Sequence, residues 1–173
     1  MLPSPDKLTD LDRTHLLSAI ALAAQARRNG NHPFGALLTD SIGSVLLTAE
    51  NTVLTERDLT GHAEINLVRL ASRTLQPSQL VHATLYASTE PCAMCSGAVY
   101  WSGVRRVVYA LAAAELNVLA GADPSEQLLD LPCRRVFEAG GSAVAVSGPH
   151  LYEDAAAVHA GYWGEEPVSP CTT

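Results

Sequence analysis

Basic residues are scarce in this chain. Its 173 residues include 11 lysines and arginines against 18 aspartates and glutamates, which gives a formal net charge of −7 at pH 7. The adjacent basic pairs, Arg27-Arg28, Arg105-Arg106 and Arg134-Arg135, each lie in or beside an expected helix or strand. A long nucleic-acid footprint needs clustered lysine and arginine, so the composition argues against nucleic acid as a partner.

Long apolar runs are also absent. Apolar stretches such as ALAA from Ala21 and GAVYW from Gly97 are far too short to span a bilayer, which takes about 20 residues. The first residues have no basic segment followed by an apolar run, so we expect no signal peptide. These features predict a cytoplasmic protein without a membrane partner, in which cysteines stay reduced.

The chain has no repeat, no low-complexity tract and no Pro/Gly-rich linker. With 47% hydrophobic and 17% charged residues it has a globular composition. Its length fits one domain that can bury a core without disulfides. We therefore expect residues 1–173 to form a single domain.

The order of expected elements predicts an α/β fold. Apolar residues recur at helical spacing over 10–28, and two short strands around Ser41-Ile42-Gly43 form a hairpin. A helix follows at 62–75, whose inward residues are Ile65, Leu67, Val68 and Leu70. Then come a strand from His82, a helix from Cys92 that ends at Gly103, and a strand from Arg105. This alternation implies a mixed sheet with helices on both faces.

The remainder has weaker signals. A looser segment runs to about Pro132, and a helix over 133–138, a strand over 143–147 and a helix over 152–159 follow it.

Two motifs contain residues that can bind a metal. Cys92 and Cys95 are three apart in the first turn of an expected helix, so their sulfurs share one face. His62 opens another helix just after Gly61. Helix N-termini carry partial positive charge, which favours thiolates. The three residues form a Cys, Cys, His set, and a tetrahedral zinc needs one more ligand.

The remaining cysteines do not supply that fourth ligand. Cys133 and Cys171 are single, and Cys171 lies in the terminal VSPCTT. For the two motif cysteines alone, structural zinc or plain packing is the alternative to catalysis. With His62 upstream, we expect water in the fourth position and a catalytic zinc.

Glu64 stands two residues after His62, so it points in a different direction along the helix. Zinc lowers the pKa of its water to roughly 7, and a nearby carboxylate that is not a ligand can take the proton. The alternative is an exposed glutamate that the helix dipole favours in a first turn.

The pattern His62-Ala63-Glu64 followed by Pro91-Cys92-Ala93-Met94-Cys95 resembles the zinc-dependent cytidine deaminase-like superfamily. The resemblance runs from the first helix through the strand at Arg105 and weakens after about Leu119. It implies a three-layer α/β/α fold with a five-stranded mixed sheet and one zinc per chain. It also implies hydrolytic removal of an exocyclic amine from a nucleobase, with Glu64 moving protons.

Within that superfamily, the stretch HPFGALL from His32 looks most like guanine deaminases. The resemblance implies that Phe34 stacks on the base, Asn51 binds its edge, the N–H of Ala63 binds a ring carbonyl and Trp101 walls the pocket. Phe34 and Trp101 could instead be core residues and Asn51 a turn residue. Conversion of guanine to xanthine and ammonia is the leading expectation. The rivals are cytosine, adenine-like or s-triazine bases, tRNA adenosine and a non-catalytic zinc-bound scaffold.

The last third of the chain is expected to complete the site. By the same resemblance, an acid here helps to move protons, and Asp123, two residues after Gly121, fits better than Glu126, although both could be solvated loop acids. The segment from about 150 to 173 closes over the pocket with Tyr162 and Trp163, or these residues simply pack the last helix. The resemblance also implies a homodimer.

Overall fold

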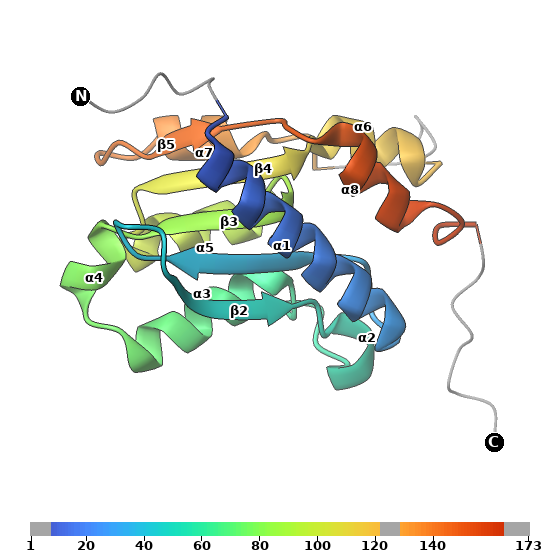
Figure 1. The fold of residues 1–173 in the computed structure, drawn as a ribbon, viewed down its shortest axis with the longest axis horizontal. Coiled ribbons are helices and arrows are strands. Elements are labelled where there is room, and N and C mark those ends of the chain that lie inside the picture. The colour runs from blue at the N-terminus through green and yellow to red at the C-terminus, as the bar shows by residue number, and fades with distance from the viewer. Residues whose placement is uncertain (1–7, 122–128, 165–173) are drawn as a thin grey trace.

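A five-stranded mixed sheet organises the chain, and its strand order is β2-β1-β3-β4-β5 (Figure 1). The computed structural model describes residues 8–121 and 129–164. β1 is antiparallel to both β2 and β3, whereas β3, β4 and β5 are parallel. The strands are β1 (Gly35–Thr39), β2 (Val45–Glu50), β3 (Thr84–Thr89), β4 (Arg106–Leu111) and β5 (Ala145–Ser147). The mixed sheet and the opening hairpin are as the sequence predicts.

Helices α1 (Asp10–Arg28) and α8 (Tyr152–His159) cover one face of the sheet (Figure 1). α1 begins at a capping box, in which Thr9 and Asp12 bind each other's backbone N–H groups. Its inner face buries Leu16 and Ile20 against Tyr86 and Val108 of the sheet. This face holds the N-terminal helix but none of the expected metal ligands.

Helices α3 (Ala63–Thr74), α5 (Ala93–Ser102) and α7 (Cys133–Glu138) cover the opposite face. Leu67 of α3 is fully buried, whereas Leu70 is 39% exposed, so the expectation that Leu70 faces inward is wrong. Ala63, Leu67 and Ala71 are spaced by four and form the inner stripe. Leu70 lies off that stripe.

Three short helices were not predicted: α2 (Val53–Glu56), α4 (Pro77–Val81) and α6 (Ala113–Leu119). α6 occupies part of the segment that we expected to be loose. Each has between four and seven residues, which is too short for helical periodicity to stand out in the sequence. No described helix is long and apolar enough to cross a membrane.

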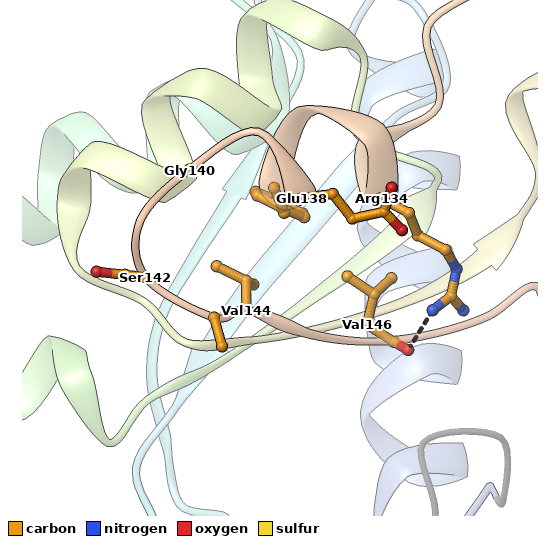
Figure 2. Close-up of a pocket in the computed structure, with 8 residues that line it drawn as sticks. Arg134, Glu138, Gly140, Ser142, Val144 and Val146 are labelled. Atoms are coloured by element: carbon orange, nitrogen blue, oxygen red, sulfur yellow. Dashed lines mark hydrogen bonds between the residues drawn. The ribbon is translucent and has the colours of Figure 1, made fainter.

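Arg134 of α7 reaches over β5 at the edge of the sheet (Figure 2). Its guanidinium donates to the carbonyl of Val146 at 2.8 Å and to that of Gly148 at 3.1 Å. Arg134, Phe137, Val144 and Val146 are among the residues that line a surface hollow of about 370 Å³ there. This hollow lies between α7 and β5 and contains none of the expected metal ligands.

Candidate active site

Three side chains from two helices meet beyond the carboxyl end of β3. The Nδ1 atom of His62 lies 3.7 Å from Sγ of Cys92 and 3.5 Å from Sγ of Cys95. All three possible ligand atoms lie within 4.8 Å of one another. The structure therefore brings together the three ligands that the sequence predicts.

The backbone explains this convergence. His62 is the N-cap of α3 and Cys92 the N-cap of α5, and neither side chain caps its own helix. Both residues are extended, so each side chain leaves its helix end toward the other. Cys95 lies one turn into α5 and is buried. Packing of α3 against α5 thus fixes the set.

The protonation of the two thiols is coupled. The pKa of Cys92 falls to about 4, chiefly because Cys95 donates a hydrogen bond to its sulfur and also because His62 lies beside it. That same hydrogen bond, together with burial, raises the pKa of Cys95. The hydrogen bond to Cys92 raises the pKa of His62. Two adjacent thiolates require a cation beside them.

The spacing fits zinc. A tetrahedral zinc has bonds of about 2.3 Å to sulfur and about 2.0–2.1 Å to nitrogen. A sulfur ligand and a nitrogen ligand of the same zinc therefore lie roughly 3.6 Å apart. The observed 3.5 and 3.7 Å agree with that separation. The set contains three ligands, which is the number typical of catalytic sites with one open position.

Glu64 lies beside this set and is 7% exposed. Its Oε2 lies 3.5 Å from Sγ of Cys95. Burial raises the pKa of Glu64, so its carboxyl group binds a proton more readily than a solvated one does. The reading of Glu64 as an exposed glutamate is therefore wrong.

A pocket of about 200 Å³ opens over these residues. On the near side it is lined by Phe34, His62, Glu64, Thr89, Glu90, Pro91 and Cys92. The pocket is also lined by Ala113, Leu116 and Asn117 of α6, and by Leu129, Asp130, Leu131 and Pro132. We refer to these seven residues as the far wall. The site thus combines a metal set, a buried carboxyl and an open pocket beside them.

Phe34 lines the pocket and is backed by aromatic residues from the end of the described chain. Its ring centroid lies 5.5 Å from that of His159 and 6.1 Å from that of Trp163. Trp163 stacks on His32 with an interplanar angle of 15°. The hydroxyl oxygen of Tyr162 lies 2.8 Å from Nδ1 of His32. The turn after α8 therefore packs directly behind Phe34.

Ala63 and Asn51 are both buried. Ala63 is the first residue of α3, where a backbone N–H has no acceptor within the helix. Asn51 does not line the pocket, and its Oδ1 accepts a hydrogen bond from the N–H of Val53 at 3.0 Å. That oxygen stabilises the turn before α2, which agrees with the alternative prediction that Asn51 is a turn residue.

Trp101 does not wall this pocket, so that expectation is wrong for the chain by itself. Its side chain is 85% exposed and lines a different hollow, together with Val68, Leu75 and Ala98. Trp101 follows Cys92 by nine residues on α5, which is two and a half turns and carries it far along the helix from the metal ligands.

The two acids expected to move protons, Asp123 and Glu126, lie outside the described residues. Asp130 and Asn117 supply polar groups to the far wall instead. Neither residue was predicted from the sequence. Both are polar residues in the segment that we expected to be loose, and no motif in that segment distinguishes them from other polar residues.

Comparison with known proteins identifies the family. Residues 9–111 match the cytidine and deoxycytidylate deaminase zinc-binding region. The chain belongs to this deaminase family. The match contains all three metal ligands and Glu64, so the geometry above is that of a zinc-binding deaminase with a His, Cys, Cys set able to hold one zinc.

Relatives within the family differ in substrate. A probable cytosine deaminase from Schizosaccharomyces pombe is 38% identical over 160 residues, which is 92% of this chain and 97% of that protein. A guanine deaminase from Bacillus subtilis is 40% identical over 98 residues, which is 56% of this chain and 62% of that enzyme.

A solved structure from a study of tRNA:A34 deaminases superposes with a TM-score of 0.64 at 27% identity. It covers 84% of this chain and 99% of that one. The cytidine deaminase-like α/β fold is thus shared by relatives that act on different substrates.

Proposed function

We propose that this deaminase acts on a free nucleobase and that cytosine is its preferred substrate. The observation that favours cytosine is that the far wall of the pocket lies within the match to a cytosine deaminase. Its residues begin at Ala113, beyond the stretch 9–111 that matches the family as a whole. The match to the fission yeast cytosine deaminase spans 92% of the chain and so includes this wall. The match to the guanine deaminase is 98 residues long.

Guanine, the leading expectation from the sequence, becomes the second candidate. Phe34 lines the pocket, and a planar base with one ring, such as cytosine, or with two fused rings, such as guanine, can stack on it. A tRNA substrate fits less well, because the chain has a net charge of −7 and 11 basic residues. A pocket of about 200 Å³ favours a small ligand.

The metal ligands, Glu64, Phe34 and Ala63 each have a role in the proposed reaction. A zinc bound by His62, Cys92 and Cys95 would supply Lewis-acid activation of water near neutral pH. Glu64 takes one proton from the attacking water and passes it to the ring nitrogen beside the attacked carbon; it then passes the remaining hydroxyl proton to the exocyclic amine, so that a C=O bond forms as the C–N bond breaks and ammonia leaves. Phe34 stacks on the ring and the N–H of Ala63 binds a ring carbonyl, whereas Asn51 holds the turn before α2.

The turn after α8 keeps Phe34 in place in this proposal. Arg27 of α1 donates to the carbonyls of Val158 and Ala160, both at 2.8 Å, and so anchors the end of α8. The ring of Trp163 stacks on His159 and lies behind Phe34. In this proposal, the segment therefore supports the substrate-binding ring from behind.

We also propose that the chain forms a homodimer through the outer face of α3, α4 and α5. This face contains an apolar hollow lined by Val68, Leu75, Leu80 and Ala98, and Trp101 projects beside it. A tryptophan that is 85% exposed is a residue type enriched where proteins associate.

Ammonia release from cytosine, guanine, adenine, an s-triazine, guanosine and a tRNA anticodon stem-loop tests the substrate. The chain with Glu64→Ala is the matched control, because it keeps the metal ligands and lacks the proton carrier. Cytosine should have the highest kcat/KM. A higher value for guanine would reverse the order of the two candidates, and release from the RNA alone would overturn the free-base assignment. No release from any compound by zinc-loaded protein would favour the non-catalytic scaffold.

A further inference from the structure

Glu90 connects the metal-binding loop to the far wall of the pocket. It follows β3 and precedes Pro91 and Cys92. One carboxylate oxygen, Oε2, accepts a hydrogen bond from the N–H of Ala113 at 3.1 Å. The other, Oε1, accepts one from the N–H of Cys133 at 3.0 Å. A single side chain therefore binds the first residue of α6 and the first residue of α7.

These two contacts lie at both ends of the far wall. Ala113 begins the part of the wall that belongs to α6, and Cys133 follows Pro132, the last residue of the part that precedes α7. Glu90 is also fixed at its base, because its own N–H donates to the carbonyl of Leu111 at 2.7 Å. The distance from Cys92 to the far wall thus depends on the length and charge of this side chain.

The chemistry requires a carboxylate. A carboxylate has two acceptor oxygens and no donor, so it can bind two N–H groups at once. Hydrogen bonds to an ionised acceptor are also shorter and stronger than those between neutral groups. A carboxamide of the same shape has one acceptor oxygen, and its NH₂ group would face the second N–H.

We propose that Glu90 is a positioning residue that sets the width of the pocket and thereby selects the substrate by size. Residues of the far wall define how large a base fits between them and Phe34, and Glu90 holds both ends of that wall at a fixed distance from Cys92. This inference rests on the proposed function, because a pocket selects only among the bases that it binds.

The test is Glu90→Gln in the zinc-loaded full chain, with steady-state kinetics on cytosine and guanine. We expect KM for the preferred base to rise about tenfold, since one charge-assisted hydrogen bond is lost. We expect kcat to stay within about threefold, because Glu64 and the metal ligands are unchanged. The ratio of kcat/KM values between the two bases should move toward one. Zinc content should equal that of the wild type.

The matched control is Glu115→Ala. Glu115 accepts a hydrogen bond from the N–H of Ala112 at 2.9 Å, so it caps the same helix, but it makes no link to the metal loop. Removal of the Glu115 side chain weakens the N-terminus of α6 but leaves the hydrogen bond between Glu90 and the N–H of Ala113 in place. We expect KM and the base ratio to stay at wild-type values.

A second variant, Ala113→Pro, tests the same link without altering Glu90. It removes the N–H that donates to Oε2, and proline is well tolerated at the first position of a helix. The preceding Ala112 has φ −71° and ψ 150°, which is the conformation that a following proline requires. We expect the same rise in KM and the same loss of selectivity as for Glu90→Gln.

The outcomes separate the possible explanations. A rise in KM with lost selectivity in Glu90→Gln and Ala113→Pro, but not in Glu115→Ala, supports the proposal. An equal rise in Glu115→Ala, unchanged KM in both test variants, or loss of zinc from Glu90→Gln would each overturn it. If the wild type deaminates neither base, the proposed function has failed, and that result is visible before any variant is measured.

Discussion

Replacing Asp12 by asparagine would test how α1 is held against the sheet. Asp12 is 3% exposed, and its carboxylate forms two hydrogen bonds with Arg106 of β4, at 2.8 and 2.9 Å. Tyr86 of β3 donates to the same carboxylate at 2.7 Å. Asparagine has a similar shape but no charge, and its NH₂ group must face donors. Breaking a buried ion pair from one side costs about 3–5 kcal/mol. Because Arg106 is partly exposed and can reach water, we expect about 3 kcal/mol at pH 7.

The loss should depend on pH in a defined direction. Burial by itself would raise the pKa of Asp12, but the hydrogen bonds and charge of Arg106, with the hydrogen bonds of Tyr86 and Thr9, hold it well below its usual range. A carboxyl group with a lowered pKa in the folded state stabilises the protein above its unfolded pKa, about 3.9 for aspartate. That contribution falls as the pH drops below this value toward the lower folded pKa. The difference between wild type and Asp12→Asn should therefore be constant from pH 7 to 5 and shrink below about pH 4.

Urea unfolding followed by circular dichroism measures this difference. Asp10→Asn is the control, because Asp10 lies in the same first turn of α1 and is exposed. Zinc loss at low pH affects all three proteins alike, since the metal ligands lie on the other face of the sheet. An equal difference in unfolding free energy at pH 7 and pH 3 would refute the assignment of the effect to the charge of Asp12.

Four further changes probe the site and the assembly. Cys92→Ala should lose zinc and lower the melting temperature, because metal binding is coupled to folding; full zinc content by metal analysis would contradict the ligand assignment. Glu64→Ala should keep zinc and fold yet lose nearly all turnover, and retained ammonia release would mean that another group carries the proton. Trp163→Ala should raise KM more than it lowers kcat, because Phe34 loses its backing; unchanged steady-state kinetics would exclude that role. Trp101→Ser should shift the protein toward monomer in light scattering at micromolar concentration, and an unchanged molar mass would place the interface elsewhere.

The metal ligands could be predicted from the sequence because each belongs to a short motif at a helix N-terminus, whereas their convergence depends on the packing of α3 against α5. His62 and Cys92 begin helices, and Cys95 lies one turn after Cys92. The buried strands and long helices have clear periodicity, so the mixed sheet and its two helical layers could also be predicted. These features depend on residues that are close in the sequence.

The far wall could not be predicted, because it depends on contacts between distant segments. Glu90 bonds to residues 23 and 43 positions further along the chain, and no sequence pattern marks those partners. α6 is seven residues long, so its periodicity is too brief to be recognised. Trp101 was misplaced because family resemblance gave its distance from Cys92 but not the direction in which α5 turns it.

β5, an outer strand of the sheet, is protected against pairing with another chain. β5 has three residues. The guanidinium of Arg134 donates hydrogen bonds to the carbonyls of Val146 and Gly148. The N–H of Ala145 is already paired with Arg105 of the neighbouring segment, so the carbonyl of Val146 points away from β4. An incoming strand would have to displace a charged group from that carbonyl. Arg134 thus discourages edge-to-edge aggregation at β5, and its replacement by an apolar residue would leave a template for cross-chain β-pairing.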